Sequence, residues 1–275
     1  MHFVGSMKRE FATINNCKIA YTLEGHSHLP VVLLSHALAT RAEIWGYQLP
    51  LLTNHFRVLR YDIRGHGESE PTGDSYTFPL LASDVAALLE YLNIARTAFV
   101  GLSIGGMIAQ QFALDYPEKL WGLVLCSTGS VTADNIKSIL EERIEKVSAE
   151  GLTGQLDPTL KRWFTKGFIE EASHTIGWVS DLILSTSVKG YIGCCRALQT
   201  LDLTEQLARI QIRTLLVPGA EDAAFPEQTS RIIQQRIGNS ELAVLRNAAH
   251  LGCVERAHAF NEILLSFLSR AAAER

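Results

Sequence analysis

The chain has 275 residues, of which 47% are hydrophobic and 20% charged, and its formal net charge at pH 7 is −4. These proportions are typical of globular domains and exclude the disordered and fibrous classes. Because neither the net charge nor any lysine-rich or arginine-rich run supplies a basic surface, we expect no nucleic-acid partner. Apolar runs such as residues 30–34 are far shorter than the roughly 18 residues that a membrane span requires, so we expect no membrane partner either.

The opening residues, MHFVGSM, lack the basic start and apolar core of a secretion signal. Gly5 and Ser6 resemble a remnant of an expression vector, so we expect the native sequence to begin at Met7. The five cysteines are an odd number and form no paired framework, which favours a reducing compartment. We therefore expect the protein in the cytoplasm.

Buried parallel strands are predicted where short runs are apolar on both faces. An alternating strand at 19–24 is followed by such runs at 31–36, 56–62, 97–103, 121–127 and 213–219, and then by a strand-like stretch at 241–245. Stretches of helical length separate them, at 42–52, 77–92, 104–116, 226–237 and 255–270. This alternation predicts an α/β fold with a mostly parallel sheet covered by helices on both faces.

The alternation breaks between residues 130 and 209, where helical patches occur without an apolar strand. Because the strand pattern resumes at Thr214, this segment is inserted within one sheet and does not follow it. We therefore predict a helical cap at 130–209 and an α/β core formed by 7–129 and 210–275.

A serine flanked by glycines stands where a predicted strand meets a predicted helix, in FVGLSIGGMIAQQF (99–112). So sharp a turn forces Ser103 into a left-handed backbone conformation, and Gly101 and Gly105 supply the space that it needs. The hydroxyl is then exposed above the sheet, beside the N–H groups that begin the helix. The alternative is a glycine-rich turn that serves only close packing or binds a phosphate. A phosphate loop would need a lysine near its end or the pattern G-x-G-x-x-G, and neither is present. We therefore predict that Ser103 is a nucleophile.

A serine hydroxyl needs a base to accept its proton, and in this arrangement the chain order is serine, acid, histidine. His250 lies in a loop between the last strand-like stretch and the final helix, so it is the predicted base. Glu221 and Asp222 compete as the acid, and we favour Asp222 because a short carboxylate on a tight loop is better fixed. The other place for an acid, after the strand at 121–127, offers none before Asp134. The acid would hold the imidazole in the required tautomer.

Two backbone N–H groups are needed to bind the oxyanion of the tetrahedral intermediate. One is predicted to come from Ile104, directly after the nucleophile, and the other from the loop SHALAT that follows the strand at 31–36. We choose Leu38 for the second donor, with Ala37 as the alternative.

Several segments together resemble α/β-hydrolase-fold enzymes, and more closely the 3-oxoadipate enol-lactonases of aromatic catabolism. They are SHALATRAEIWGYQLPLL, FRVLRYDIRGHGES, FVGLSIGGMIAQQFALDYPEKLWGLVLCST, GAED and AAHLGCVE. The resemblance implies that Ser103, Asp222 and His250 form a catalytic triad and that Leu38 and Ile104 donate to the oxyanion. In this family a glycine often stands where this chain has Ala39.

The predicted cap is expected to cover the pocket and to select the substrate. Aromatic residues that could form apolar walls are Trp163, Phe164, Phe168, Trp178 and Tyr191, although helical spacing also suits plain packing. Cations that could bind an acidic lactone are Arg41, Arg162, Lys189 and Arg196, although each could be an ordinary solvated charge. From these two groups we select Trp163, Trp178, Arg41 and Arg196 as the predicted substrate-binding residues.

The function predicted from the sequence is that of a cofactor-free serine hydrolase acting on carboxylic esters or lactones, including 3-oxoadipate enol-lactone. Neither HExxH nor paired CxxC spacing is present, so no metal is expected. Two alternatives stay open. The same fold could act as a carbon–carbon bond hydrolase or a haloperoxidase-type perhydrolase, or the protein could be a small-molecule receptor with a vestigial triad.

Overall fold

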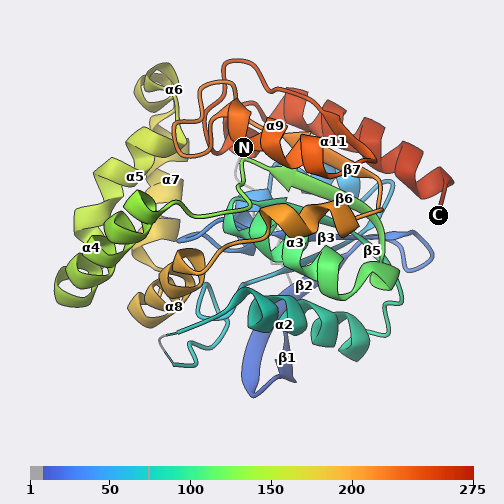
Figure 1. Cartoon of the computed structure of the whole chain (residues 1–275), viewed down its shortest axis with the longest axis horizontal. Helices are drawn as coiled ribbons and strands as arrows, with labels where there is room; N and C mark the ends of the chain where they lie inside the picture. Colours follow the sequence, from blue (N-terminus) through green and yellow to red (C-terminus); the bar gives the residue numbers. More distant parts are fainter. Residues whose placement is uncertain (1–8, 74) are drawn as a thin grey trace.

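The computed structural model describes residues 9–73 and 75–275 (Figure 1). The predicted vector remnant and the predicted start at Met7 lie outside these residues. The described chain forms an eight-stranded sheet in the order β1-β2-β4-β3-β5-β6-β7-β8. Its strands are β1 (Glu10–Ile14), β2 (Cys17–Glu24), β3 (Val31–Ser35), β4 (Arg57–Tyr61), β5 (Thr97–Leu102), β6 (Leu120–Cys126), β7 (Thr214–Val217) and β8 (Ser240–Leu242).

The sheet is mostly parallel, as the buried apolar runs predicted. From β4 through β3, β5, β6 and β7 to β8 every neighbouring pair is parallel, whereas β1, β2 and β4 pair antiparallel. Strand β1 was not predicted. It forms a hairpin with β2 through Asn15 and Asn16, both with positive φ, a conformation that asparagine tolerates better than most residues.

Side chains alternate between two hydrophobic layers, one on each face of the sheet. Val32 and Leu34 of β3 pack in the layer that includes Phe267, whereas Leu33 packs in the layer that includes Phe99 and Phe112. The first layer is covered by α11 (Ala257–Ala273), and the second by α2 (Phe78–Tyr91) and α3 (Ile104–Asp115). Helix α9 (Glu227–Arg236) packs against β7 and β8. The predicted sheet with helices on both faces is therefore confirmed.

One predicted helix is divided in the structure. The stretch at 42–52 forms a 3-10 turn, Ala42–Trp45, and a short α1, Leu49–Leu52, whereas the stretch predicted at 255–270 forms α11, preceded by a separate short α10 (Gly252–Glu255). The remaining short 3-10 turns are Pro117–Lys119, Thr153–Gln155 and Thr204–Arg209. No helix within 9–73 and 75–275 is both long and apolar enough to cross a membrane.

Between β6 and β7 the chain leaves the sheet and forms five α-helices within the segment predicted to be a helical cap, and we call these helices the cap. Its helices are α4 (Asp134–Glu150), α5 (Leu156–Trp163), α6 (Lys166–Glu171), α7 (Ser173–Leu184) and α8 (Val188–Gln199). Figure 1 shows them gathered beyond one end of the sheet, on the side opposite the C-terminus. Helices α4 and α8 pack against each other, and Val131 forms an isolated bridge with Asp202 where the chain enters and leaves this segment.

Candidate active site

Ser103 occupies a strained turn between β5 and α3. Its backbone angles are φ 58° and ψ −119°, in a region that non-glycine residues rarely adopt. Close backbone contacts leave no room for a side chain at the glycines on either side of it. A Cβ on Gly101 would lie 2.3 Å from the Gly105 carbonyl oxygen, and a Cβ on Gly105 would lie 2.4 Å from the Ser35 carbonyl oxygen. The turn therefore depends on the absence of side chains at both positions.

Neighbouring backbone holds this turn in place. The Ser103 N–H donates to the Cys126 carbonyl (2.9 Å), and the Thr128 hydroxyl donates to the Ser103 carbonyl (2.7 Å). Because α3 begins at Ile104, the N–H of Ile104 has no partner within the helix and points along the positive end of the helix dipole. This is the arrangement that an oxyanion donor needs.

His250 and Asp222, predicted from separate loops, meet in the structure. The Nδ1 atom of His250 lies 2.9 Å from Oδ2 of Asp222, and both side chains are buried. The other carboxylate oxygen accepts hydrogen bonds from the N–H groups of Ala224 (2.8 Å) and Phe225 (3.0 Å). Burial pushes the pKa of Asp222 upward, but the charge and hydrogen bond of His250 and these two N–H donors outweigh it, so the pKa is lowered. An ionised Asp222 leaves Nε2 as the basic nitrogen of the ring.

Aromatic rings enclose the imidazole from two directions. Trp163 of the cap stacks on His250 with ring centroids 6.1 Å apart, and Phe225 stacks on it at 5.7 Å. The cap is also tied to this loop through its backbone, because the N–H of Leu251 donates to the Trp163 carbonyl (3.0 Å). Trp163 therefore limits the orientations that the imidazole can adopt.

Glu255 is a buried carboxylate that the sequence reasoning missed. It accepts a hydrogen bond from the N–H of Ala249 (2.9 Å), directly before His250, and another from the Thr165 hydroxyl of the cap. Glu255 thus joins the histidine loop to the cap. Its place in the segment AAHLGCVE, beside the predicted base, was the available signal.

The loop carrying Leu38 is held by a buried histidine. His36 Nε2 accepts a hydrogen bond from the N–H of Ile63 (2.9 Å), so the proton is on Nδ1, which donates to the Ala37 carbonyl (2.8 Å). Burial lowers the pKa of His36 to about 4. The neutral tautomer is therefore maintained at neutral pH, and the loop keeps both bonds.

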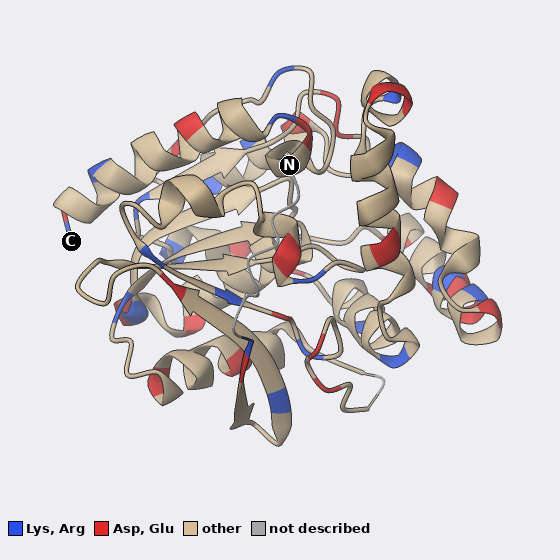
Figure 2. Ribbon diagram, turned by 180° about the vertical axis from the view of Figure 1, so that it is seen from behind, with Lys and Arg blue, Asp and Glu red and all other residues tan. Residues whose placement is uncertain are grey.

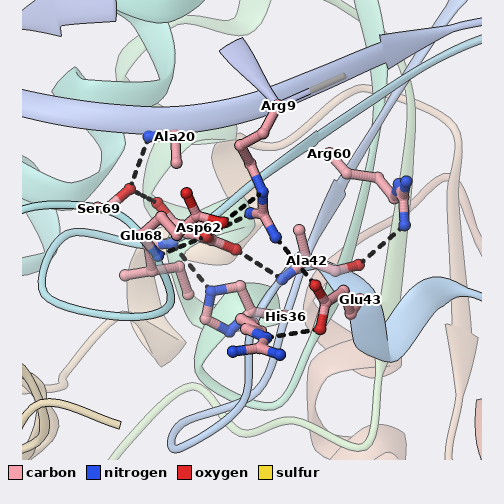
Figure 3. A network of polar contacts seen from close by, with 11 residues as sticks. Arg9, Ala20, His36, Ala42, Glu43, Arg60, Asp62, Glu68 and Ser69 are labelled. Carbon is pink, nitrogen blue, oxygen red and sulfur yellow. Dashed lines mark hydrogen bonds and ion pairs between the residues drawn. The ribbon is translucent and has the colours of Figure 1, made fainter. Parts of the chain in front are cut away.

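Asp62 connects this loop to the start of the described chain (Figure 3). It is buried and accepts hydrogen bonds from the N–H groups of Ala42 (2.8 Å) and Glu68 (2.9 Å), and it forms an ion pair with Arg9 (2.5 Å). Burial raises the pKa of Asp62, and the charge of Arg9 and the two N–H donors act against that rise. Arg9 also pairs with Glu43 (3.2 Å). The network therefore fixes the backbone on both sides of the predicted donor loop.

A cavity of about 440 Å³ lies between the core and the cap. His250 lines it together with Leu38 and Met107, whose N–H donates to the Ser103 carbonyl (3.2 Å). Its other lining residues include Ala39, Val131, Ile136, Ile139, Leu140, Arg143, Gln155, Thr159, Arg162, Trp163, Ile183, Tyr191, Leu198, Ala224, Phe225 and Thr229. Among the described lining residues two are arginines and none is acidic, so the cavity favours an anion.

The two cavity arginines come from different cap helices. Arg143 belongs to α4 and has no ion pair among the described residues, and Arg162 belongs to α5 and reaches only the Thr159 hydroxyl (3.2 Å). Burial and then the charge of Arg143 lower the pKa of Arg162. The sequence analysis considered Arg162 and missed Arg143. The signal was the spacing from Leu140 and Val147, which puts Arg143 near the buried face of its helix.

The other residues predicted to bind substrate do not share one location. Trp163 lines the cavity. Trp178 packs edge-on against Tyr47 with ring centroids 6.1 Å apart, Arg41 forms an ion pair with Glu43 (2.6 Å), and Arg196 forms an ion pair with Glu141. Lys189 is exposed on α8. The lining residues of the cavity do not include Trp178, Arg41, Arg196 or Lys189.

Comparison with known proteins places this chain within a family. Residues 30–257 match the alpha/beta hydrolase fold family. The chain is 30% identical to 3-oxoadipate enol-lactonase 2 of Acinetobacter baylyi, over 95% of this chain and 97% of that protein. The crystal structure of the enol-lactonase from Burkholderia xenovorans superposes with a TM-score of 0.92 at 32% identity, covering 94% of this chain and 100% of that one. A hydrolase from Pseudomonas aeruginosa gives a TM-score of 0.92 at 35% identity, covering 96% and 99%. This chain belongs to the α/β-hydrolase family.

Proposed function

We propose that this protein is a serine hydrolase of carboxylic esters or lactones that works through an acyl-enzyme on Ser103. The observation that carries the proposal is the strained backbone of Ser103 at the start of α3 (φ 58°), one turn before the cavity-lining Met107, together with the buried His250, which lines the same cavity and is paired with Asp222 at 2.9 Å. A packing role would not require a serine to be held in this conformation.

In the first step Ser103 Oγ attacks the carbonyl carbon while His250 Nε2 accepts its proton. The negative charge develops on the carbonyl oxygen, where the N–H groups of Leu38 and Ile104 bind it. The proton on His250 then passes to the departing oxygen, and the carbon–oxygen bond breaks. In a lactone that oxygen stays tethered to the acyl group.

In the second step water attacks the acyl-enzyme. His250 accepts a proton from the water, the oxyanion again binds the two N–H groups, and the proton returns to Ser103 Oγ as the carboxylic acid leaves. Asp222 keeps the imidazole in one tautomer and stabilises its protonated form throughout. Because Asp222 is buried and hydrogen-bonded on both oxygens, it is fixed for this role.

The substrate class we propose is an ester or lactone that carries a carboxylate, with 3-oxoadipate enol-lactone as one member. Arg143 and Arg162 support this choice, because two cations face one cavity without an acidic side chain among its described lining residues. The Acinetobacter baylyi relative is named a 3-oxoadipate enol-lactonase, which supports the same substrate class. A substrate carboxylate would replace the missing counter-charge.

A fluorophosphonate probe tests the chemistry without knowledge of the substrate. We expect the folded protein to take up one equivalent of the probe on Ser103, located by mass spectrometry, and the Ser103→Ala variant to take up none. An unlabelled wild-type protein with a native circular dichroism spectrum would contradict the proposal and favour a receptor. Assays with p-nitrophenyl esters, 3-oxoadipate enol-lactone, dienone acids and peroxide with acetate then separate ester or lactone hydrolysis from carbon–carbon cleavage and perhydrolysis.

A further inference from the structure

One face of α4 carries large apolar side chains that are exposed at the mouth of the cavity. Ile136, Ile139, Leu140 and Arg143 are spaced i, i+3, i+4 and i+7, and all four line the cavity. Ile136 is 42% exposed and Ile139 40%, and Val131 beside them, also on the lining, is 52% exposed. We call Val131, Ile136 and Ile139 the apolar lip.

The remainder of α4 makes the lip unusual. The helix reads DNIKSILEERIEKVSAE, in which the outward positions are charged and the inward positions Leu140, Ile144 and Val147 are buried. The lip side chains fit neither pattern, because they are apolar and yet exposed. Their apolar surface is open to water at the entrance of the cavity, where a ligand could cover it.

The lip side chains are exposed, whereas both cavity arginines are partly buried. Arg143 lies seven positions after Ile136, which corresponds to about 10 Å along a helix. A ligand that reaches from Arg143 to Ile136 therefore has a polar end within the cavity and an apolar end at its mouth. A small lactone with only polar substituents would leave the lip uncovered.

We infer that the apolar lip binds an aliphatic chain on the acyl part of the substrate. This inference rests on the proposed function and narrows it to substrates whose acyl group carries an extended alkyl chain. The acyl part is favoured over the alcohol part because it stays attached to Ser103 through both steps. Contacts to it therefore contribute to acylation and to deacylation.

The kinetic test is a series of p-nitrophenyl esters from acetate to octanoate. A fully buried methylene contributes about fourfold in affinity, and the lip is half open to water, so we expect kcat/KM to rise about twofold per methylene, or about 60-fold over the series. The double variant Ile136→Gln/Ile139→Gln should reduce this rise to less than about fivefold. Glutamine keeps the length of the side chain and favours the helix.

Ile232 on α9 provides a matched control. It is 40% exposed, like Ile139, and the cavity lining does not include it. The Ile232→Gln variant should keep the full chain-length dependence. A wild-type protein that hydrolyses acetate as well as octanoate, or a double variant that keeps the rise, would overturn the inference while leaving the proposed function intact.

A binding experiment separates the lip from the chemistry. In the Ser103→Ala variant, titration calorimetry with butanoate, hexanoate and octanoate should show affinity that increases with chain length, and the added double substitution should remove that increase. This result does not depend on turnover, so it tests the lip even if fluorophosphonate labelling fails. Equal affinities for the three acids would overturn the inference. The inference would also be overturned if the wild-type protein sedimented as a dimer and the double variant as a monomer, because the lip would then bind a second copy of the chain.

Discussion

Helices α3 and α4 differ more in the buried fraction of their residues than any other two helices that line the cavity. In α3, from Ile104 to Leu114, every residue is buried, whereas in the seventeen-residue α4 only Leu140, Ile144 and Val147 are. Figure 2 shows acidic and basic residues along the cap helices, whereas the one charged residue of α3 is Asp115, which follows the buried run. The core side is fixed by packing from all directions, and the cap side is fixed on one face only.

This difference separates two kinds of requirement. A nucleophile must be held within a fraction of an ångström, which a fully buried helix and a close-packed glycine turn provide. A substrate pocket must present particular side chains to a ligand, which a helix with one open face provides. We therefore expect substitutions in the core to change turnover of every substrate and substitutions in the cap to change the preference among substrates.

Asp222→Asn tests the core side and has the largest expected effect. An amide cannot hold the imidazole in the same tautomer or stabilise its protonated form, so kcat should fall about 10⁴-fold. The loss should be the same for charged and neutral esters, measured as initial rates. A loss of kcat that depends on the charge of the substrate would contradict the expectation that core residues affect every substrate alike.

Arg143→Met tests the cap side. Removing one charge-assisted hydrogen bond costs about 2 kcal/mol, so KM for a carboxylate-bearing ester should rise about 30-fold, while kcat/KM for p-nitrophenyl acetate changes little. Arg196→Met is the matched control, because Arg196 is in the same cap and pairs with Glu141 away from the cavity lining. An equal rise of KM in the Arg196→Met variant would instead support Arg196, which the sequence analysis selected, as a substrate-binding residue.

The two sides also differ in how well the sequence predicted them. Ser103 and Asp222 follow predicted buried strands and His250 follows a predicted strand-like stretch, and parallel strands bring such loops to one edge of the sheet. In the cap, helical spacing predicted which residues face inward but not which helix faces the cavity, so Arg143 was missed and Arg196 was chosen. Hairpin β1 was missed because a five-residue edge strand, EFATI, has no apolar run.

Burial in the core also makes stability depend on pH. His66 is buried, its ring centroid is 5.4 Å from that of His36, and burial followed by the charge of His36 lowers its pKa to about 3. The unfolded chain takes up a proton near pH 6.5, so the free energy of unfolding falls as the pH drops from 6.5 toward 3. The slope contributed by this one group approaches about 1.4 kcal/mol per pH unit between its two pKa values.

His66→Leu should therefore make the stability less dependent on pH between 6 and 4, measured by urea unfolding at several pH values. Leucine is of similar size and leaves no polar atom in the buried site. His258→Gln is the control, because the His258 side chain is 88% exposed and its substitution should leave the slope unchanged. Parallel curves for wild type and His66→Leu would show that His66 does not stay neutral in the folded core.

The smallest expected effect concerns strain in the donor loop. Ala39 has φ 57°, a left-handed conformation that costs a residue with a Cβ about 1 kcal/mol relative to glycine. Ala37, in the same loop, is also buried but does not have a positive φ. Each of the two Ala→Gly substitutions removes one buried methyl group and increases the conformational entropy of the unfolded chain by the same amount. The difference between their free energies of unfolding therefore isolates the strain. Ala39→Gly should unfold with a free energy about 1 kcal/mol above that of Ala37→Gly in urea titrations. Equal values would mean that the loop relaxes without cost, and that Leu38 is held by the bonds of His36 and Asp62 alone.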